Sequence, residues 1–226
     1  MKPVTWPSPT ADGGETTEYA LTFDQGRQHR VLVIPALFNE SNKLRRLTVE
    51  VMRRLDGAGI DAFLPDLPGT NESLAPLAMQ TLEGWTGAML AAANHFRANR
   101  VLAMRGGGLI VPKVIPGWHY APVKGASQLR HMLRARTLAS RELGREESQD
   151  SLMAQGVASG LDLIGYQFGS EMLRQLQERV PDKRTGITVI EQDLIGGGGL
   201  WLRAEPGEDR EQADALAAVI TMGLTA

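Results

Sequence analysis

The sequence contains no cysteine, and this absence excludes several kinds of chemistry at once. Without thiols there is no disulfide, no thiolate nucleophile, no iron–sulfur cluster and no zinc site that uses sulfur. Histidine is scarce as well, because only His29, His95, His119 and His131 occur, with neither i, i+4 nor His-x-His spacing. We therefore expect no histidine-rich metal site, and no metal or other cofactor.

An excess of one charge and a long apolar run are also missing. The 24 basic and 26 acidic side chains leave a formal net charge of -2, so no global field favours binding to nucleic acid or to an anionic membrane. The longest apolar run, residues 31–38, is far shorter than the ~20 residues of a membrane-spanning helix. The first residues lack the apolar core of a secretory signal. We expect a cytoplasmic protein without membrane insertion, and the composition leaves its oligomeric state open.

What the sequence does contain is a regular alternation of apolar strands and amphipathic helices. With 226 residues, 42% hydrophobic and 22% charged, we expect one globular domain over residues 1–226. Strands are expected at 18–23, which alternates like an edge strand, and at 30–34, 60–65, 100–104, 118–123, 186–190 and 200–204; helices are expected at 42–55, 82–96, 128–143, 170–180 and from 211 onward. This order predicts an α/β fold with a parallel sheet covered by helices on both faces.

One helix in this pattern is strongly basic. It covers residues 128–143 and carries Arg130, Arg134, Arg136 and Arg141. The regular alternation is weaker around it, so we expect residues 124–160 to form a small helical cap or lid inserted into the domain. Four arginines on one helix are most often a solvated face, but over a pocket they would favour an anionic ligand.

Ligands of open α/β sheets bind at the carboxyl ends of the strands, so the loops after the predicted strands are the places to examine. Three of these loops have unusual sequences: PALFNESNK after Ile34, DLPGTNES after Pro65, and AMRGGG at the end of the strand 100–104. Together they give a strand with a polar loop, a second strand with a DLPG turn, and a third strand with a glycine-rich elbow.

These motifs resemble the α/β-hydrolase fold. More narrowly, PALFNESNKLRR, FLPDLPGTNES, MRGGGL and APVKGASQLRHMLRARTLAS resemble the second type of hydrolase-like protein associated with the exosortase A system, which is found beside exopolysaccharide genes. The resemblance covers most of residues 30–180. That family has PPF-x-EE-x-NK-x-RR in the first loop and G-x-R-x-G at the elbow, so Ala36, Leu37 and Ala103 depart from its pattern. The resemblance implies a hydrolase-like fold and a role in an exosortase- and exopolysaccharide-linked pathway.

The elbow decides what such a fold can do. In a working α/β-hydrolase, G-x-S-x-G exposes a serine hydroxyl above the sheet, and the next N–H helps to bind the oxyanion. Here Arg105 takes the place of the serine, and a guanidinium that stays protonated cannot act as a nucleophile. The histidine that should follow the last strand is also missing, because none occurs after His131 and Glu205 lies near its expected position. The sequence thus predicts a degenerate catalytic triad.

A replacement nucleophile has little support in the sequence. Ser127, in GASQL, lacks the final glycine of the motif and has only His119 and His131 nearby in sequence as bases. Arg105 itself has two interpretations. It forms an ion pair with Glu40, Asp66 or Glu205 that fills the former active site, or it binds a carboxylate or phosphate beside Gly106 and the start of a helix.

The candidate ligand-binding residues are those of the first loop, the elbow and one late aromatic position: Phe38, Asn39, Glu40, Asn42, Lys43, Arg105, Gly106 and Trp201. Some have simpler roles, because Asn42 suits a helix N-cap and Glu40 and Lys43 suit a charged surface. Gly106–Gly108 lacks the pattern of a nucleotide-binding loop.

Three functions remain open from the sequence. The first is a hydrolase-like protein that binds a small anionic molecule without turnover. The second is a non-standard ester or thioester hydrolase, or an acyltransferase, in which Arg105 polarises a carbonyl and Glu40, Asp66, Glu191, Asp193 or Glu205 acts as acid or base. The third is a scaffold protein that contacts its partners through the cap and an apolar patch.

Overall fold

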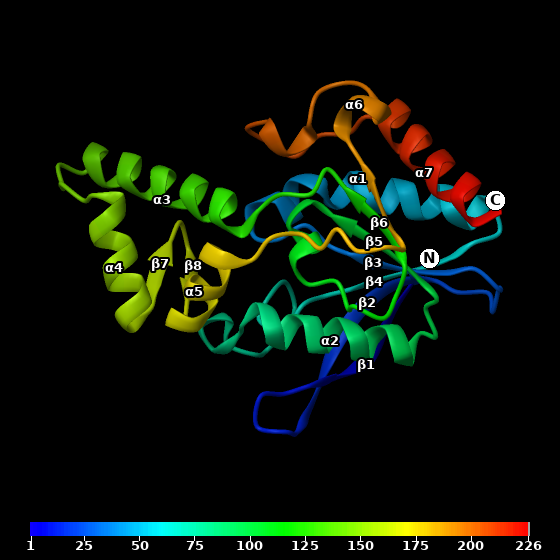
Figure 1. Cartoon of the computed structure of the whole chain (residues 1–226), viewed down its shortest axis with the longest axis horizontal. Helices are drawn as coiled ribbons and strands as arrows, with labels where there is room; N and C mark the ends of the chain where they lie inside the picture. Colours follow the sequence, from blue (N-terminus) through cyan, green and yellow to red (C-terminus); the bar gives the residue numbers. More distant parts are fainter. Residues whose placement is uncertain (226) are drawn as a thin grey trace.

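The computed structural model describes residues 1–225 and contains a central sheet of seven strands in the order β1-β2-β4-β3-β5-β6-β9 (Figure 1). The strands are β1 (Lys2–Pro9), β2 (Glu15–Phe23), β3 (Arg30–Ile34), β4 (Asp61–Pro65), β5 (Arg100–Met104), β6 (Gly117–Tyr120) and β9 (Ile187–Ile190). β1 and β2 are antiparallel to their neighbours, whereas β4, β3, β5, β6 and β9 pair in parallel. The predicted parallel sheet is confirmed for its central part.

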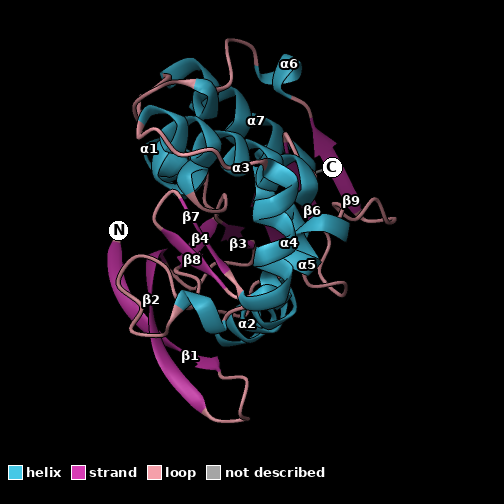
Figure 2. Ribbon diagram, turned by 90° about the vertical axis from the view of Figure 1, so that its left-hand side faces the viewer, coloured by secondary structure: helices cyan, strands magenta, loops and turns pink. Residues whose placement is uncertain are grey.

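Helices cover both faces of this sheet, as predicted. α1 (Asn39–Gly57) and α7 (Arg210–Thr225) lie on one face, and α2 (Leu82–His95) lies on the other (Figures 1 and 2). The stripe of Leu44, Leu47, Val51 and Leu55 on α1 is buried, at most 1% exposed, because it packs on the sheet. The alternating strands bury Val31 and Val33 towards this face, and Leu32 and Ile34 towards the other.

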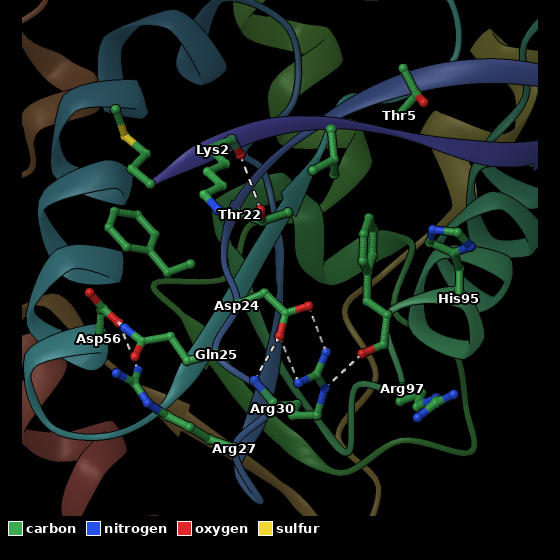
Figure 3. Close-up of a pocket in the computed structure, with 15 residues that line it drawn as sticks. Lys2, Thr5, Thr22, Asp24, Gln25, Arg27, Arg30, Asp56, His95 and Arg97 are labelled. Carbon is green, nitrogen blue, oxygen red and sulfur yellow. Dashed lines mark hydrogen bonds and ion pairs between the residues drawn. The ribbon is translucent and has the colours of Figure 1, made fainter.

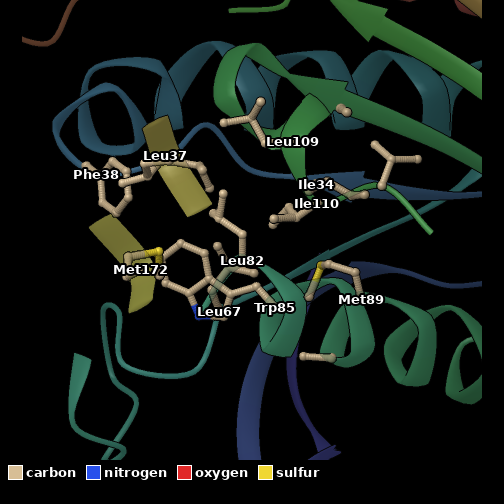
Figure 4. Close-up of a cluster of buried hydrophobic side chains, with 14 of the residues drawn as sticks. Ile34, Leu37, Phe38, Leu67, Leu82, Trp85, Met89, Leu109, Ile110 and Met172 are labelled. Atoms are coloured by element: carbon tan, nitrogen blue, oxygen red, sulfur yellow. The ribbon is translucent and has the colours of Figure 1, made fainter. Parts of the chain in front are cut away.

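The core on the α2 face is the one that reaches the loops at the carboxyl ends of the strands. Figure 4 shows Trp85, Leu82 and Met89 of α2 packed beneath Ile34 and Leu109, with Phe38 and Met172 at one side. Trp85 is completely buried, and its indole N–H donates to the Pro68 carbonyl at 2.9 Å. This bond satisfies the polar atom of a large buried ring and fixes the loop after β4.

A separate lobe lies between β6 and β9. It consists of α3 (Gly125–Glu142), α4 (Gln149–Ser159), the hairpin of β7 (Leu161–Leu163) and β8 (Tyr166–Phe168), and α5 (Ser170–Glu178). Figure 1 shows these elements together beside the sheet, at the end where the first and third loops lie. The hairpin was not predicted, because three-residue strands give no readable periodicity.

Three sequence predictions about elements are wrong. The strand 18–23 is not an edge strand, because β1 pairs along its outer side. Residues 200–204 form no strand; Leu200–Leu202 is a short 3₁₀ helix (η3), which follows α6 (Gln192–Ile195) and a turn of four glycines. The apolar Leu200 is buried against the α1 and α7 face instead, so its hydrophobicity reflects packing and not a strand.

The third error concerns α1, which begins at Asn39 rather than after Asn42. The residue before it, Phe38, has φ 56 and its side chain makes no capping hydrogen bond. The predicted N-cap Asn42 therefore lies inside the first turn of the helix. The helix begins earlier than predicted because Phe38, in a left-handed conformation, turns the chain that leaves β3 directly into the helix.

Candidate functional site

The elbow after β5 is a strained turn. Arg105 has φ 52, in the left-handed region that L-residues rarely occupy, and it follows directly on the buried strand. Gly107 passes so close to the end of β3 that an added Cβ would lie 2.6 Å from the Pro35 carbonyl oxygen and 2.8 Å from that of Ile34. The glycine is therefore required by close approach of two backbones, and the strain at Arg105 is the kind that marks functional turns.

The elbow does not lead into an α-helix. Residues Arg105–Leu109 form a 3₁₀ helix (η2), and the chain then runs without an α-helix to β6 at Gly117. The prediction that the start of a helix helps Arg105 to hold an anion is thus wrong. A single 3₁₀ turn has no long row of aligned peptide dipoles, so positive charge at this site comes from the guanidinium itself.

Arg105 is held by three hydrogen bonds to two neighbours. Its Nε and Nη2 donate to the two carboxylate oxygens of Glu40 at 3.1 and 3.0 Å, and its Nη1 donates to the Ala121 carbonyl at 2.8 Å. The side chains of the pair are 12% and 14% exposed. The predicted partner Glu40 is thus the observed one, and the fork-to-fork geometry is the strongest form of an arginine–carboxylate contact.

Trp201 covers the guanidinium from the other side. Its ring centroid lies 3.9 Å from the Cζ of Arg105, which is a close cation–π contact, and its ring meets Tyr120 edge to face. Lys43 donates from Nζ to the Trp201 carbonyl at 3.3 Å, which ties η3 to α1. Lys43, one of the predicted ligand-binding residues, therefore binds the main chain of η3 and does not contact the Arg105 guanidinium.

A small cavity of about 190 Å³ opens beside this pair. It is lined by the first loop, the elbow, η3 and the first turns of α3: Phe38, Asn39, Glu40, Arg105, Val123, Ser127, Gln128, His131, Met132, Trp201 and Leu202. Five of the predicted ligand-binding residues are in this set. Gly106 lies beneath it, because an added Cβ there would collide with the Gln128 amide at 2.5 Å.

The α3 side of the cavity was only partly foreseen. Ser127 and His131 lie one helical turn apart and both line the cavity, although no hydrogen bond joins them. Gln128 is 7% exposed, and its Oε1 is buried with no hydrogen-bond partner in the described part of the chain. The spacing of 127 with 131 and of 128 with 132 on a helix could have shown that they share a face, but not that this face covers the elbow.

The remaining predicted residues lie elsewhere. Asn42 lines a second cavity of about 390 Å³, which Phe38 separates from the first and which the lobe residues 165–167 also line. Asp66 accepts a hydrogen bond from Asn71 at 2.6 Å; burial raises the pKa of its carboxyl, and it does not line the cavity of Arg105. Glu191, Asp193 and Glu205 are exposed and line neither cavity.

The position after β9 carries an unexpected contact. Glu191 precedes α6, but the side chain that reaches the sheet is Gln192, whose amide oxygen accepts a hydrogen bond from the Tyr120 hydroxyl. Burial raises the pKa of Tyr120 to about 12, so this hydroxyl remains protonated. The side chain that contacts the sheet here is thus a neutral amide, whereas the acid Glu191 beside it is exposed.

The histidine on β6 makes no hydrogen bond with Ser127. His119 is completely buried on β6, and neither ring nitrogen has a partner among residues 1–225. Burial, with the nearby Arg184 charge, lowers the pKa of His119 to about 4, so the ring is neutral. No group of three histidine, aspartate or glutamate side chains within the described residues is placed to hold a metal ion.

No helix of residues 1–225 is both long and apolar enough to span a membrane. No family model and no curated protein matches the sequence. Solved structures do match over the whole chain. DcsB, solved with a substrate analogue, is 12% identical with a TM-score of 0.59 and full coverage of both chains.

Two further solved structures are similar. Est1E from Butyrivibrio proteoclasticus, solved with ferulic acid bound, is 13% identical over 92% of this chain and 95% of its own, with a TM-score of 0.55. Alpha/beta hydrolase domain-containing protein 10 from mouse is 12% identical over 100% and 99%, with a TM-score of 0.54. Identities this low establish the fold and not the activity. The chain has the α/β-hydrolase fold, with arginine at its elbow.

Proposed function

We propose that this protein binds a small anionic molecule beside Arg105 and does not hydrolyse it, so that it is a hydrolase-like protein with a degenerate triad. The observation that carries the proposal is the arginine at the strained elbow, with φ 52 and its guanidinium at the wall of a cavity. The position that should hold a nucleophile holds a permanent cation, and His119, the one histidine on the neighbouring strand, is buried away from it.

The Glu40 carboxylate supports this proposal, because it occupies Arg105 as a carboxylate ligand would. Glu40 and Ala121 use three of the five guanidinium N–H groups, so two remain for a ligand in the cavity. Ser127 and His131 add a hydroxyl and a titratable ring on the opposite wall. A short carboxylate or the phosphate group of a larger molecule fits the small volume and these donors.

The place of this activity in the cell is part of the same proposal. The motif resemblance to exosortase-associated hydrolase-like proteins supports a role for the bound anion in an exopolysaccharide-linked pathway. We propose that the protein is cytoplasmic and uses no cofactor. We further propose that residues 124–160, which include the first two helices of the lobe, act as a lid on the cavity.

Thermal melting with matched variants tests the binding proposal. The wild type, Arg105→Gln and Glu40→Gln are melted with short carboxylates, sugar phosphates, nucleotide sugars and acyl-CoAs. A ligand at ~100 Kd stabilises the folded state by ~2.7 kcal/mol, which raises the Tm by several degrees. We expect this shift in the wild type, its loss in Arg105→Gln, and a larger shift in Glu40→Gln, where the competing carboxylate is removed.

The opposite result has its own meaning. If both variants melt well below the wild type and no compound shifts any of the three, the Arg105–Glu40 pair is a structural plug. The binding proposal is then wrong.

A second function rests on the placement of Ser127 and His131, which line the same cavity one helical turn apart. This arrangement favours a non-standard ester or thioester hydrolase with Ser127 as nucleophile, rather than one that uses the exposed Glu191, Asp193 or Glu205. Hydrolysis of p-nitrophenyl acetate that Ser127→Ala abolishes, and that Ser159→Ala leaves unchanged, would establish it. Ser159 is a suitable control because it is exposed at the end of α4.

A further inference from the structure

A cavity larger than the one at the elbow lies at the amino ends of the parallel strands. It is a groove of about 870 Å³ between β1, the end of β2, the start of β3 and the carboxyl ends of α1 and α2. Its lining includes Lys2, Thr22, Asp24, Arg27, Arg30, Asp56, Phe23, His95, Phe96 and Arg97 (Figure 3). None of these residues belongs to the candidate site described above.

The two carboxylates that line this groove already accept hydrogen bonds from its arginines. Asp24 accepts from Arg30 Nη1 and Nη2 at 2.9 and 3.1 Å. Asp56 accepts from Arg27 Nη1 at 2.7 Å and from the Gln25 amide at 3.1 Å. Neither acid therefore has a strong attraction left for a cation that enters the groove.

Beneath the groove, Asp61 is completely buried and binds both arginines from below. It accepts from Arg30 Nη1 at 2.7 Å and from the Arg27 main-chain N–H at 2.8 Å. This network fixes Arg27 and Arg30 in place as a rigid floor. A rigid floor lowers the entropic cost of ordering donors around a ligand.

Several cationic donors of the groove, by contrast, have no acceptor. Within residues 1–225, no hydrogen bond or ion pair involves the Lys2 ammonium, the Arg97 guanidinium or the Nε and Nη2 of Arg27. Figure 3 shows Lys2, Arg27 and Arg97 on different sides of the same opening. Donors that approach from several directions suit the oxygens of a phosphate better than a flat carboxylate, which prefers one fork.

Part of the wall is apolar. The rings of Phe23 and Phe96, each 6% exposed, line the groove with the aliphatic Val4. A wall of this kind beside unpaired cations fits a molecule with one phosphate group and an aromatic or alkyl body, because the ring contacts exclude water while the phosphate meets the donors.

We propose that this groove is a second ligand site, which binds an organic phosphate through Lys2, Arg27 and Arg97 with its apolar body against Phe23 and Phe96. The site is independent of Arg105. It is formed by the opposite end of the sheet, and its charge pattern makes binding weaken as salt rises.

Isothermal titration with phenyl phosphate tests this site, with benzyl alcohol, inorganic phosphate and benzoate as comparison compounds. We expect saturable binding of phenyl phosphate to the wild type, weaker binding of the other three, and at least a tenfold rise in Kd in Lys2→Gln/Arg97→Gln. Both of these side chains are exposed, so the double variant should melt with the wild type.

A control protein and a second-site variant locate the binding. Arg130→Gln/Arg134→Gln removes the same charge from exposed positions of α3 and should bind phenyl phosphate as the wild type does. Arg105→Gln removes the elbow cation and shows whether any phenyl phosphate binds at the elbow; the binding that remains in this variant should be lost when Lys2→Gln/Arg97→Gln is added. The proposal is overturned if the wild type shows no saturable binding, if the groove double variant binds with unchanged Kd, or if the α3 control loses affinity equally. Complete loss in Arg105→Gln would place the phosphate at the elbow and also overturn it.

Discussion

Arginine–carboxylate pairs lie at both ends of the central sheet, and the two ends use them differently. At the amino ends, Arg27 and Arg30 share the fully buried Asp61, and every carboxylate has more than one donor. At the carboxyl ends, Arg105 has the single acid Glu40, a strained backbone and an open cavity. A buried carboxylate shared by two arginines stabilises a fold, whereas a single pair beside a cavity is suited to exchange its carboxylate for a ligand.

The largest expected effect is at the amino end. Asp61→Ala should lower the free energy of unfolding by about 3–5 kcal/mol, because it removes the buried carboxylate that pairs with Arg30 and leaves the Gln25 and Arg27 main-chain N–H groups without an acceptor. Urea denaturation measures this loss. Asp56→Ala is the matched control, since its side chain is 28% exposed, and it should cost well under half as much. Equal losses would mean that burial does not separate the two acids.

At the elbow, a disturbed backbone contact should lower the free energy of unfolding more than the loss of the Arg105–Glu40 ion pair. Gly107→Ala should cost about 1–3 kcal/mol, because its Cβ would collide with two carbonyl oxygens that cannot move without shifting β3. Gly57→Ala near the end of α1 is the control, since an added Cβ meets no atom within 4 Å there. The same urea denaturation compares them, and a Gly107→Ala protein as stable as Gly57→Ala would remove the argument for a constrained elbow.

His119 lies between the two ends and gives a dependence on pH. Its folded pKa of about 4 is below the unfolded value of ~6.5, so the unfolded state binds more protons between these values. Stability should therefore fall as the pH drops from ~6.5 towards 4, by at most about 1.4 kcal/mol per pH unit, and level off below.

The contribution of His119 is isolated by subtraction. Burial raises the pKa of the Glu18 and Asp66 carboxyls, which acts in the opposite direction at acid pH, so the wild type is compared with His119→Leu at each pH. The difference should grow as the pH falls, whereas exposed His131→Gln should track the wild type. A His119→Leu curve parallel to that of the wild type would show that the buried ring is not the cause.

The smallest effect is expected for the elbow pair itself. Glu40→Gln should cost about 1–2 kcal/mol, because the amide keeps one acceptor for the partly exposed Arg105 and Trp201 still covers the guanidinium. A double-mutant cycle with Arg105→Gln measures the coupling. A coupling as large as the loss in Asp61→Ala would make the two ends alike and would favour the structural plug.

Much of the fold follows from local pattern. The strand Arg100–Met104 and the apolar stripe of α1 were predicted as the structure has them, because the hydrophobic pattern of neighbouring residues is enough to predict both. The β1 strand, the hairpin of the lobe and the 3₁₀ helix at Trp201 were not predicted. Their conformations depend on which sheet edge or partner is available, and this is a property of the assembled chain.

Some contacts of the candidate site could likewise be predicted from the sequence, and others could not. Arg105 and Glu40 could be predicted to meet because both follow strands that are adjacent in this topology. Gln128, with its buried amide on Gly106, could not, because nothing in the sequence sets how the lobe lies against the elbow. Asp66 and Glu205 were candidates by order along the chain, and the path of their loops carries them away from Arg105.

The most direct test of the central claim uses Trp201, which lies on the Arg105 guanidinium. It is the one tryptophan that is not buried, since Trp6, Trp85 and Trp118 are at most 6% exposed. Titration with acetate, butyrate and glucose 6-phosphate should give a saturable change in tryptophan emission that is absent in Arg105→Gln and in Trp201→Phe. Emission that stays constant in the wild type with every compound, or that changes equally in Arg105→Gln, would contradict a ligand site at the elbow.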